Sequence, residues 1–225
     1  MRASEPGPYR AVLFDFGGVL TAPLGERFAR FFIETGVDPD RFRDVIAEAY
    51  APLGPEPGDA HRSGAVADLE TGRLPVAEFE VHLAAELSVG LEEPLPAEGL
   101  ARRIFGDLET DPEMLDVVDS IRSRGFATAL VSNTWGEAPA IREVTGAFDT
   151  IVLSHEEGCR KPEPRIYLLA AARLGIEPEE CVFVDDIPTN VEGAEAVGMA
   201  GVLHRHASLT VPRLETLLGA GPDRP

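Results

Sequence analysis

Five short, mainly apolar runs recur along the chain, and each is followed by polar residues or glycine. The runs lie at 11–14, 127–131, 150–153, 181–184 and 201–203. Continuous runs of this length are typical of strands buried on both faces, as in a parallel sheet covered by helices. The pattern therefore predicts five strands, and the run at 11–14 has the character of a fully buried one.

Helical patterns alternate with these strands from residue 111 onward. Asp111 and Pro112 form a typical helix start, and Gly125 ends that helix. Alternating strands and helices joined by short loops predict an α/β fold with a doubly wound, mostly parallel sheet. The other helices of this part are expected at 137–145, 164–174, 188–197 and 209–218.

The segment between the first two predicted strands has a different pattern, with apolar residues at helical spacing and no strand-like run. Phe28, Phe31 and Phe32 share one helical face, and similar stripes run over 42–49 and 76–87. This region is therefore expected to be helical throughout.

We expect residues 21–105 to form an all-helical cap, inserted into an α/β core made of residues 1–20 and 106–225. Prolines and glycines at 51–58 interrupt the helical pattern of the cap. Ligands of open α/β sheets bind at the carboxyl ends of the strands. Because the cap follows the first strand, it is placed to act as a lid.

The charge of the chain limits its partners. Its net charge is −19, from 39 acidic and 20 basic residues, which argues against a nucleic-acid partner. An anionic substrate would need positive charge built locally, from a metal or a few basic side chains.

The remaining composition points to a cytoplasmic protein. No apolar run approaches the roughly 18 residues that span a bilayer, and residues 1–10 lack the apolar stretch of a secretory signal. Two cysteines are too few for a disulfide framework. We expect no membrane partner and a monomer or homodimer.

Polar groups stand where four of the predicted segments end or turn. They are Asp15, the pair Ser132 and Asn133, Lys161, and the pair Asp185 and Asp186. In a parallel sheet, the carboxyl ends of the strands share one edge, so these distant residues are expected to meet there.

The chemistry of these groups is complementary. Three nearby carboxylates repel one another when ionised, and Mg²⁺ relieves that repulsion while binding substrate phosphate. Lys161 adds a compact positive charge, and Ser132 offers a hydroxyl group. An aspartate beside a cation can act as a nucleophile. The set suits phosphoryl transfer from a small phosphorylated molecule.

Four segments resemble, in order, the four motifs of the haloacid dehalogenase superfamily. The resemblance covers roughly residues 10–205 and is to the branch with a helical cap, which includes the phosphatase-like N-terminal domain of soluble epoxide hydrolases. It implies a Rossmann-like core and a hydrolase. The four segments are Phe14–Leu20, Val131–Thr134, Arg160–Tyr167 and Phe183–Asp186.

The resemblance implies a role for each phosphate-binding residue. Asp15 would be the nucleophile, forming an aspartyl-phosphate. Ser132 and Asn133 would bind the transferring phosphoryl group. Lys161 would neutralise charge on both the nucleophile and the phosphate.

The resemblance also implies a Mg²⁺ site. Its ligands would be Asp15, the backbone carbonyl of Gly17 and Asp186, with Asp185 supporting the ion through water. Asn190 would lie behind these ligands.

Gly17 departs from the family pattern. Phosphatases of the superfamily usually carry a second Asp there, which protonates the leaving group, and such an acid contributes about 10²–10⁴-fold. The substrate could have a good leaving group, another residue could act as the acid, or activity could be weak. His155 and Glu156 are candidate substitutes, although solvated loop positions are the simpler interpretation.

Two alternatives to a phosphatase remain open. Dehalogenases of the superfamily also lack the second Asp, but they need no metal and do not retain the acidic pair, which is intact here as Asp185 and Asp186. The other alternative is a weakened member that binds a phosphorylated ligand or protein without turnover.

Two further residues allow more than one interpretation. Trp135 could line the pocket beside Ser132 or pack under a loop. Arg160 could add positive charge beside Lys161, although a solvent-exposed arginine is the default expectation.

Overall fold

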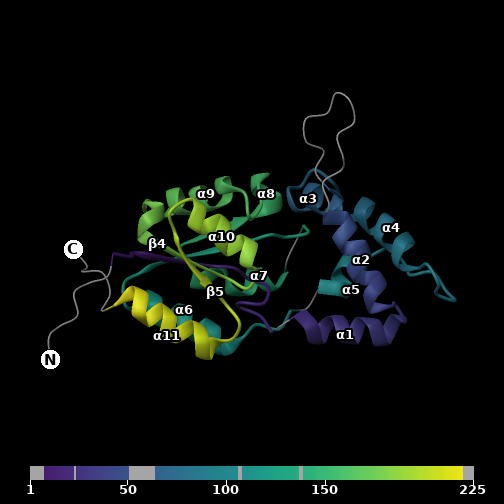
Figure 1. Ribbon diagram of the computed structural model, residues 1–225, viewed down its shortest axis with the longest axis horizontal. Helices are drawn as coiled ribbons and strands as arrows, with labels where there is room; N and C mark the ends of the chain where they lie inside the picture. Colours follow the sequence, from purple (N-terminus) through teal and green to yellow (C-terminus); the bar gives the residue numbers. More distant parts are fainter. Residues whose placement is uncertain (1–7, 23, 51–63, 106–107, 137–138, 220–225) are drawn as a thin grey trace, which may run out of the picture.

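Five parallel strands form one sheet in the order β3-β2-β1-β4-β5 (Figure 1). The computed structural model describes residues 8–22, 24–50, 64–105, 108–136 and 139–219. The predicted α/β fold is confirmed. The strands are β1 (Ala11–Phe14), β2 (Ala127–Ser132), β3 (Thr150–Leu153), β4 (Cys181–Asp185) and β5 (Ala200–Leu203).

Helices cover both faces of this sheet because alternate strand residues point to opposite sides. Val12 and Phe14 belong to the apolar cluster with α6 and α11, whereas Ala11 and Leu13 belong to the cluster with α9. Figure 1 shows α9 on one side and α6 and α11 on the other. The helices are α6 (Pro112–Ser123), α7 (Pro139–Val144), α9 (Pro164–Leu174), α10 (Pro188–Ala196) and α11 (Ala207–Leu218).

The helical insertion, by which we mean α1 to α5, follows β1 and lies to one side of the sheet in Figure 1. Its apolar stripes meet in a separate buried cluster that includes Phe31, Leu69 and Leu83. The division of the chain into core and cap stays a prediction, which this separate cluster favours. The five helices are α1 (Leu24–Thr35), α2 (Pro39–Tyr50), α3 (Ala65–Glu70), α4 (Val76–Leu87) and α5 (Leu100–Phe105).

The two ends of the insertion run side by side. Thr21 and Thr110 form an isolated antiparallel bridge. Next to it, the Ala22 N–H donates to the Glu109 carbonyl at 3.0 Å, and the Asp111 N–H donates to the Leu20 carbonyl at 2.8 Å. The chain therefore leaves and re-enters the core at one place.

Small differences separate this fold from the sequence-based expectation. A four-residue helix, α8 (Ser154–Glu157), replaces the loop expected after β3, and such a helix is too short to show a periodic pattern. The predicted break at 51–58 and the first two residues of the helix expected at 137–145 lie outside the described residues. Among the described helices, none has the length and apolarity to cross a bilayer.

Candidate active site

The carboxyl ends of the neighbouring strands β1 and β4 bring the predicted acidic residues together. Asp15 follows β1, and its N–H donates to the Val184 carbonyl of β4 at 2.9 Å. Asp185 ends β4, and Asp186 follows it. Carboxylate oxygens of Asp15, Asp185 and Asp186 lie within 4.8 Å of one another.

Lys161 lies between two of these carboxylates. Its Nζ atom is 2.6 Å from Asp15 Oδ1 and 2.7 Å from Asp185 Oδ2, and its side chain is 1% exposed. A buried ammonium group requires such partners. One lysine faces three acidic groups here, so the cluster keeps an excess of negative charge that suits a cation.

The pKa values of this cluster follow from burial and charge. Burial, opposed by the charge of Lys161, raises the pKa of Asp15 to about 7. Burial alone would lower the pKa of Lys161, but the charges of Asp15 and Asp185 outweigh it and raise that pKa. Burial and then the charge of Asp185 raise the pKa of Asp186.

Asp185 and Asp186 differ in how their oxygens are used. Asp185 Oδ1 accepts from the Ile187 N–H at 2.8 Å, and Asn190 Nδ2 lies 3.1 Å from both oxygens of Asp185. Asp186 Oδ1 is buried and makes no hydrogen bond with any described residue. Because a buried carboxylate oxygen without a partner is costly, Asp186 is the acidic residue best prepared to bind a cation directly.

Two adjacent glycines shape the approach to Asp186. Gly18 has a φ of +75°, which favours glycine, and a Cβ atom there would lie 2.4 Å from Asp186 Oδ2, so a larger residue would have to displace that carboxylate. At Gly17, a Cβ atom would meet no other atom within 4 Å. No described atom therefore blocks the first side-chain atom at the position where the family pattern has its second Asp.

The residues predicted to bind phosphate come from two loops that are tied together. The Asn133 side chain accepts from the Lys161 N–H at 2.8 Å and donates to the Lys161 carbonyl at 3.0 Å. Ser132, which ends β2, is 4% exposed. The structure thus joins the loop after β2 to the backbone of Lys161.

Glu70, at the end of α3 in the helical insertion, was missed by the sequence reasoning. It is 3% exposed and accepts hydrogen bonds from Asn133 Nδ2 at 3.3 Å, Trp135 Nε1 at 3.4 Å and Arg160 Nε at 2.5 Å. Nothing in its local sequence marks it, because its partners lie far away along the chain.

The structure also shows the surroundings of Arg160 and Trp135, for which the sequence allowed more than one interpretation. The Arg160 side chain is only 18% exposed, so the expectation of a solvent-exposed arginine was wrong, because Glu70 holds it. The Trp135 ring packs against Phe105 and Phe79, with centroids 4.4 and 5.1 Å apart, so it enters the apolar cluster of the insertion.

Neither candidate substitute for the missing acid contacts Asp15. His155 Nδ1 shares a hydrogen bond with Thr134 Oγ1, and the Glu156 side chain is 61% exposed. Among the described residues, no hydrogen bond or ion pair joins either side chain to the acidic cluster. The described contacts therefore do not link either residue to Asp15, and a role for either as the acid stays a prediction.

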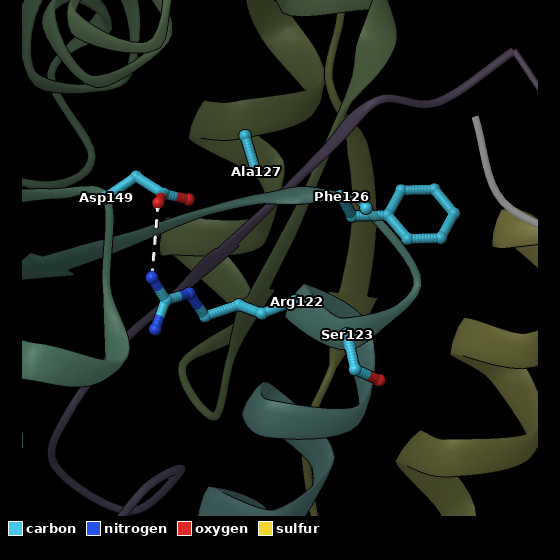
Figure 2. Close-up of a pocket in the computed structure, with 6 residues that line it drawn as sticks. Arg122, Ser123, Phe126, Ala127 and Asp149 are labelled. Carbon is cyan, nitrogen blue, oxygen red and sulfur yellow. Dashed lines mark hydrogen bonds and ion pairs between the residues drawn. The ribbon is translucent and has the colours of Figure 1, made fainter. Parts of the chain in front are cut away.

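A cavity of about 520 Å³ lies at the other end of the sheet (Figure 2). It is lined by Ala127, the first residue of β2, and by Arg122 and Asp149, which pair with each other at 3.4 Å. Because these charges already compensate one another, this cavity lacks the chemistry gathered around Asp15.

Two curated relatives are similar in sequence to most of this chain. Bifunctional epoxide hydrolase 2 of Sus scrofa is 28% identical over 226 residues, covering 93% of this chain but only 39% of that protein. Glyceraldehyde 3-phosphate phosphatase of Methanopyrus kandleri is 28% identical over 205 residues, covering 86% of this chain and 82% of that protein. The chain thus spans well under half of the epoxide hydrolase.

Solved structures agree with the fold. A HAD-like family hydrolase from Porphyromonas gingivalis matches with a TM-score of 0.64 and 28% identity, covering 93% of this chain and 98% of that one. A HAD family enzyme from Bacteroides thetaiotaomicron, solved with magnesium and inorganic phosphate, has a TM-score of 0.62 at 20% identity, covering 88% and 95%. The family model of haloacid dehalogenase-like hydrolases matches residues 9–198. The chain belongs to the haloacid dehalogenase-like hydrolase family.

Proposed function

We propose that this protein is a Mg²⁺-dependent phosphatase that hydrolyses a small phosphorylated metabolite through an aspartyl-phosphate on Asp15. The observation that carries this proposal is the buried carboxylate cluster, in which Lys161 compensates Asp15 and Asp185 while Asp186 Oδ1 has no hydrogen-bond partner among the described residues. A dehalogenase would have no use for such an oxygen. The phosphatase from Methanopyrus kandleri supports the same substrate class.

The donor set fits Mg²⁺. Asp15, Asp186 and the Gly17 carbonyl would hold the ion, since Mg²⁺ prefers hard oxygen ligands and usually takes one or two carboxylates. The Asp185 oxygens already accept from Lys161 and Asn190, which favours a supporting role for Asp185. When bound, Mg²⁺ would neutralise negative charge on the carboxylates and the phosphate.

The side chains of this chain carry the transfer itself. An Asp15 carboxylate oxygen attacks phosphorus as the bond to the leaving oxygen breaks, and Lys161 offsets the charge on both partners. The Ser132 hydroxyl and nearby backbone N–H groups hold the phosphoryl oxygens. Water then attacks phosphorus, releases inorganic phosphate and regenerates Asp15. Because Gly17 offers no acid, the leaving oxygen takes its proton from water, which favours substrates with good leaving groups.

Phosphate release from an aryl phosphate tests this proposal. We expect turnover with Mg²⁺ and none with excess chelator. Equal turnover in chelator would contradict the metal-dependent mechanism. Halide release from a 2-haloacid without metal would identify a dehalogenase instead, and stabilisation by phosphate without product would identify a non-catalytic binding protein.

A further inference from the structure

Two buried glutamates of the helical insertion differ in where their partners lie. Glu80, in α4, accepts from the Ala101 N–H at 2.9 Å and the Gly99 N–H at 3.1 Å, so both of its partners belong to the insertion itself. Glu70, which is also buried, accepts hydrogen bonds from the side chains of Asn133, Trp135 and Arg160, which lie outside the insertion. Glu80 is therefore a structural residue of the insertion, whereas Glu70 connects the insertion to the core.

The partners of Glu70 lead directly to the proposed phosphate site. Asn133 uses its side chain to hold both backbone groups of Lys161. Arg160 is the residue before Lys161, and its Nε lies 2.5 Å from Glu70 Oε2. A displacement of Glu70 would therefore reach the backbone of Lys161 by two routes, through the side chain of Asn133 and through the preceding residue, Arg160.

Two further contacts fix the same part of the insertion against the core. The Trp135 ring, from the loop after β2, packs between Phe79 and Phe105 of the insertion. At Gly72, just after α3, a Cβ atom would lie 2.5 Å from the His155 carbonyl oxygen of α8, so the two backbones touch. Charge, ring packing and backbone contact thus all meet around Glu70.

We propose that Glu70 is a positioning residue that holds Asn133 and Arg160, and through them Lys161, in the geometry that phosphoryl transfer requires. The inference rests on the proposed function and adds a role for the insertion in it. A buried ion pair gains little net stability, because desolvation offsets the attraction, but it fixes geometry. Glu70 therefore makes the arrangement of the phosphate site depend on docking of α3.

The isosteric variant Glu70→Gln tests this role. It keeps the shape of the side chain but loses the charge that faces Arg160. We expect kcat/KM for an aryl phosphate to fall about 10–100-fold, because a small misplacement of catalytic groups has costs of this size. Most of the loss should be in kcat, since Lys161 is needed most in the transition state.

Glu80→Gln is the matched control, because it removes the same charge from another buried glutamate of the same insertion, 7% exposed against 3% for Glu70. It should lower the melting temperature but leave kcat/KM within about threefold of wild type. If both variants lose activity in proportion to their loss of stability, Glu70 has only a structural role and the inference is wrong.

A second variant, Arg160→Met, tests the same contact from the side of the core if Glu70→Gln folds poorly. The double variant combines Arg160→Met with Glu70→Gln. If the two residues act through one contact, the double variant should be no less active than the worse single variant, because their effects are not additive. Losses that multiply would show that the residues act independently, and would overturn the inference.

The fluorescence of Trp135 gives a readout that needs no turnover. It is the only tryptophan of the chain, and its indole N–H donates to Glu70. Glu70→Gln should increase its quenching by acrylamide, and Glu80→Gln should not. If the wild type lacks phosphatase activity yet Trp135 responds to Glu70→Gln, the proposed function fails while the docking contact stands. If instead the wild type is an active phosphatase, but Glu70→Gln changes neither the quenching of Trp135 nor kcat/KM, the proposed function stands and the role of Glu70 is wrong.

Discussion

The carboxyl edge of the sheet and the helical insertion bury their charged groups in different ways. At the edge, Lys161 lies 2.6 Å from Asp15 and 2.7 Å from Asp185, so these three charges compensate one another. Asp15 and Asp185 stand at the carboxyl ends of the paired strands β1 and β4, and Lys161 reaches them from the loop before α9. In the insertion, the buried side chains are mainly apolar, and Glu70 depends on partners from another part of the chain.

This difference suggests that the two regions have different tasks: the sheet edge carries the reacting groups, and the insertion influences how those groups are positioned. The edge of the sheet holds the groups that we propose for phosphoryl transfer, without an acid at Gly17. The insertion adds no nucleophile or metal ligand among its described residues, but it contacts the loops that present Asn133 and Lys161. The comparison predicts that variants at the edge change the chemistry itself, and that variants in the insertion change how well the site is assembled.

The largest effect is expected from Asp15→Asn. It removes the proposed nucleophile, so Mg²⁺-dependent phosphate release from an aryl phosphate should fall by about 10⁴-fold or more. Asp149→Asn is the control, because it also removes an aspartate that pairs with a basic side chain, at the opposite end of the sheet. A fully active Asp15→Asn variant would place the nucleophile elsewhere.

A pair of identical deletions compares the stability of the two regions. Leu83→Ala in α4 and Leu13→Ala in β1 each empty a buried site, and each should lower the free energy of unfolding by about 2–5 kcal/mol. Hydrogen exchange should accelerate mainly within the insertion for Leu83→Ala, and throughout the sheet for Leu13→Ala. The same exchange pattern in both variants would show that the two clusters unfold as one unit.

Gly17→Asp should supply the acid that the proposed mechanism lacks for protonating the leaving group. A Cβ atom at this position would meet no other atom within 4 Å, so a side chain can start there, and the carboxyl group of an aspartate would supply a proton to a poor leaving group. Turnover of an alkyl phosphate relative to an aryl phosphate should rise by about 10²-fold or more. Gly17→Asn has the same size but no acid, and an equal gain in that variant would rule out proton transfer as the cause.

Gly18→Ala should weaken the proposed metal site, because residue 18 lies next to Asp186. The new methyl group would collide with Asp186, so the apparent Mg²⁺ affinity measured by titration of activity should fall about 10–100-fold. Gly146→Ala adds the same methyl group where no atom lies within 4 Å and should leave the affinity unchanged. An unaffected Gly18→Ala variant would argue against Asp186 as a ligand.

The smallest effect is a pH dependence of stability. Between the ordinary pKa of 3.8 and about 7, folded metal-free protein keeps a proton on Asp15 that the unfolded chain has lost. Its stability should therefore decrease as pH rises through this window. Mg²⁺ requires the ionised carboxylate, so its thermal stabilisation should be larger at about pH 8 than at about pH 5. A Mg²⁺ effect that does not change with pH would contradict this coupling.

Much of the sheet edge could be predicted because its signals are local. Buried strands are continuous apolar runs, and the polar residue that ends each run marks the edge. Asp15 and Asp185 were found in this way, and parallel pairing of Phe14 with Val184 brings them together. The unpaired oxygen of Asp186 needed the structure, because it depends on the direction of one side chain.

The role of Glu70 could not be predicted for the opposite reason. It ends a helix of six residues, too short for a clear periodicity, and its partners lie 63 to 90 positions away along the chain. An acidic residue in an amphipathic segment is usually solvated. Only the docking of α3 against the loops after β2 and before α9 shows why Glu70 is buried.

The antiparallel bridge between Thr21 and Thr110 has a consequence for the history of such proteins. A segment whose two ends enter the core side by side can be lengthened, shortened or exchanged while β1 and β2 keep their places. The catalytic edge can then be inherited unchanged while successive insertions adapt it to new substrates. In this chain, a different insertion would have to provide new partners for the contacts that Glu70 and Trp135 now make.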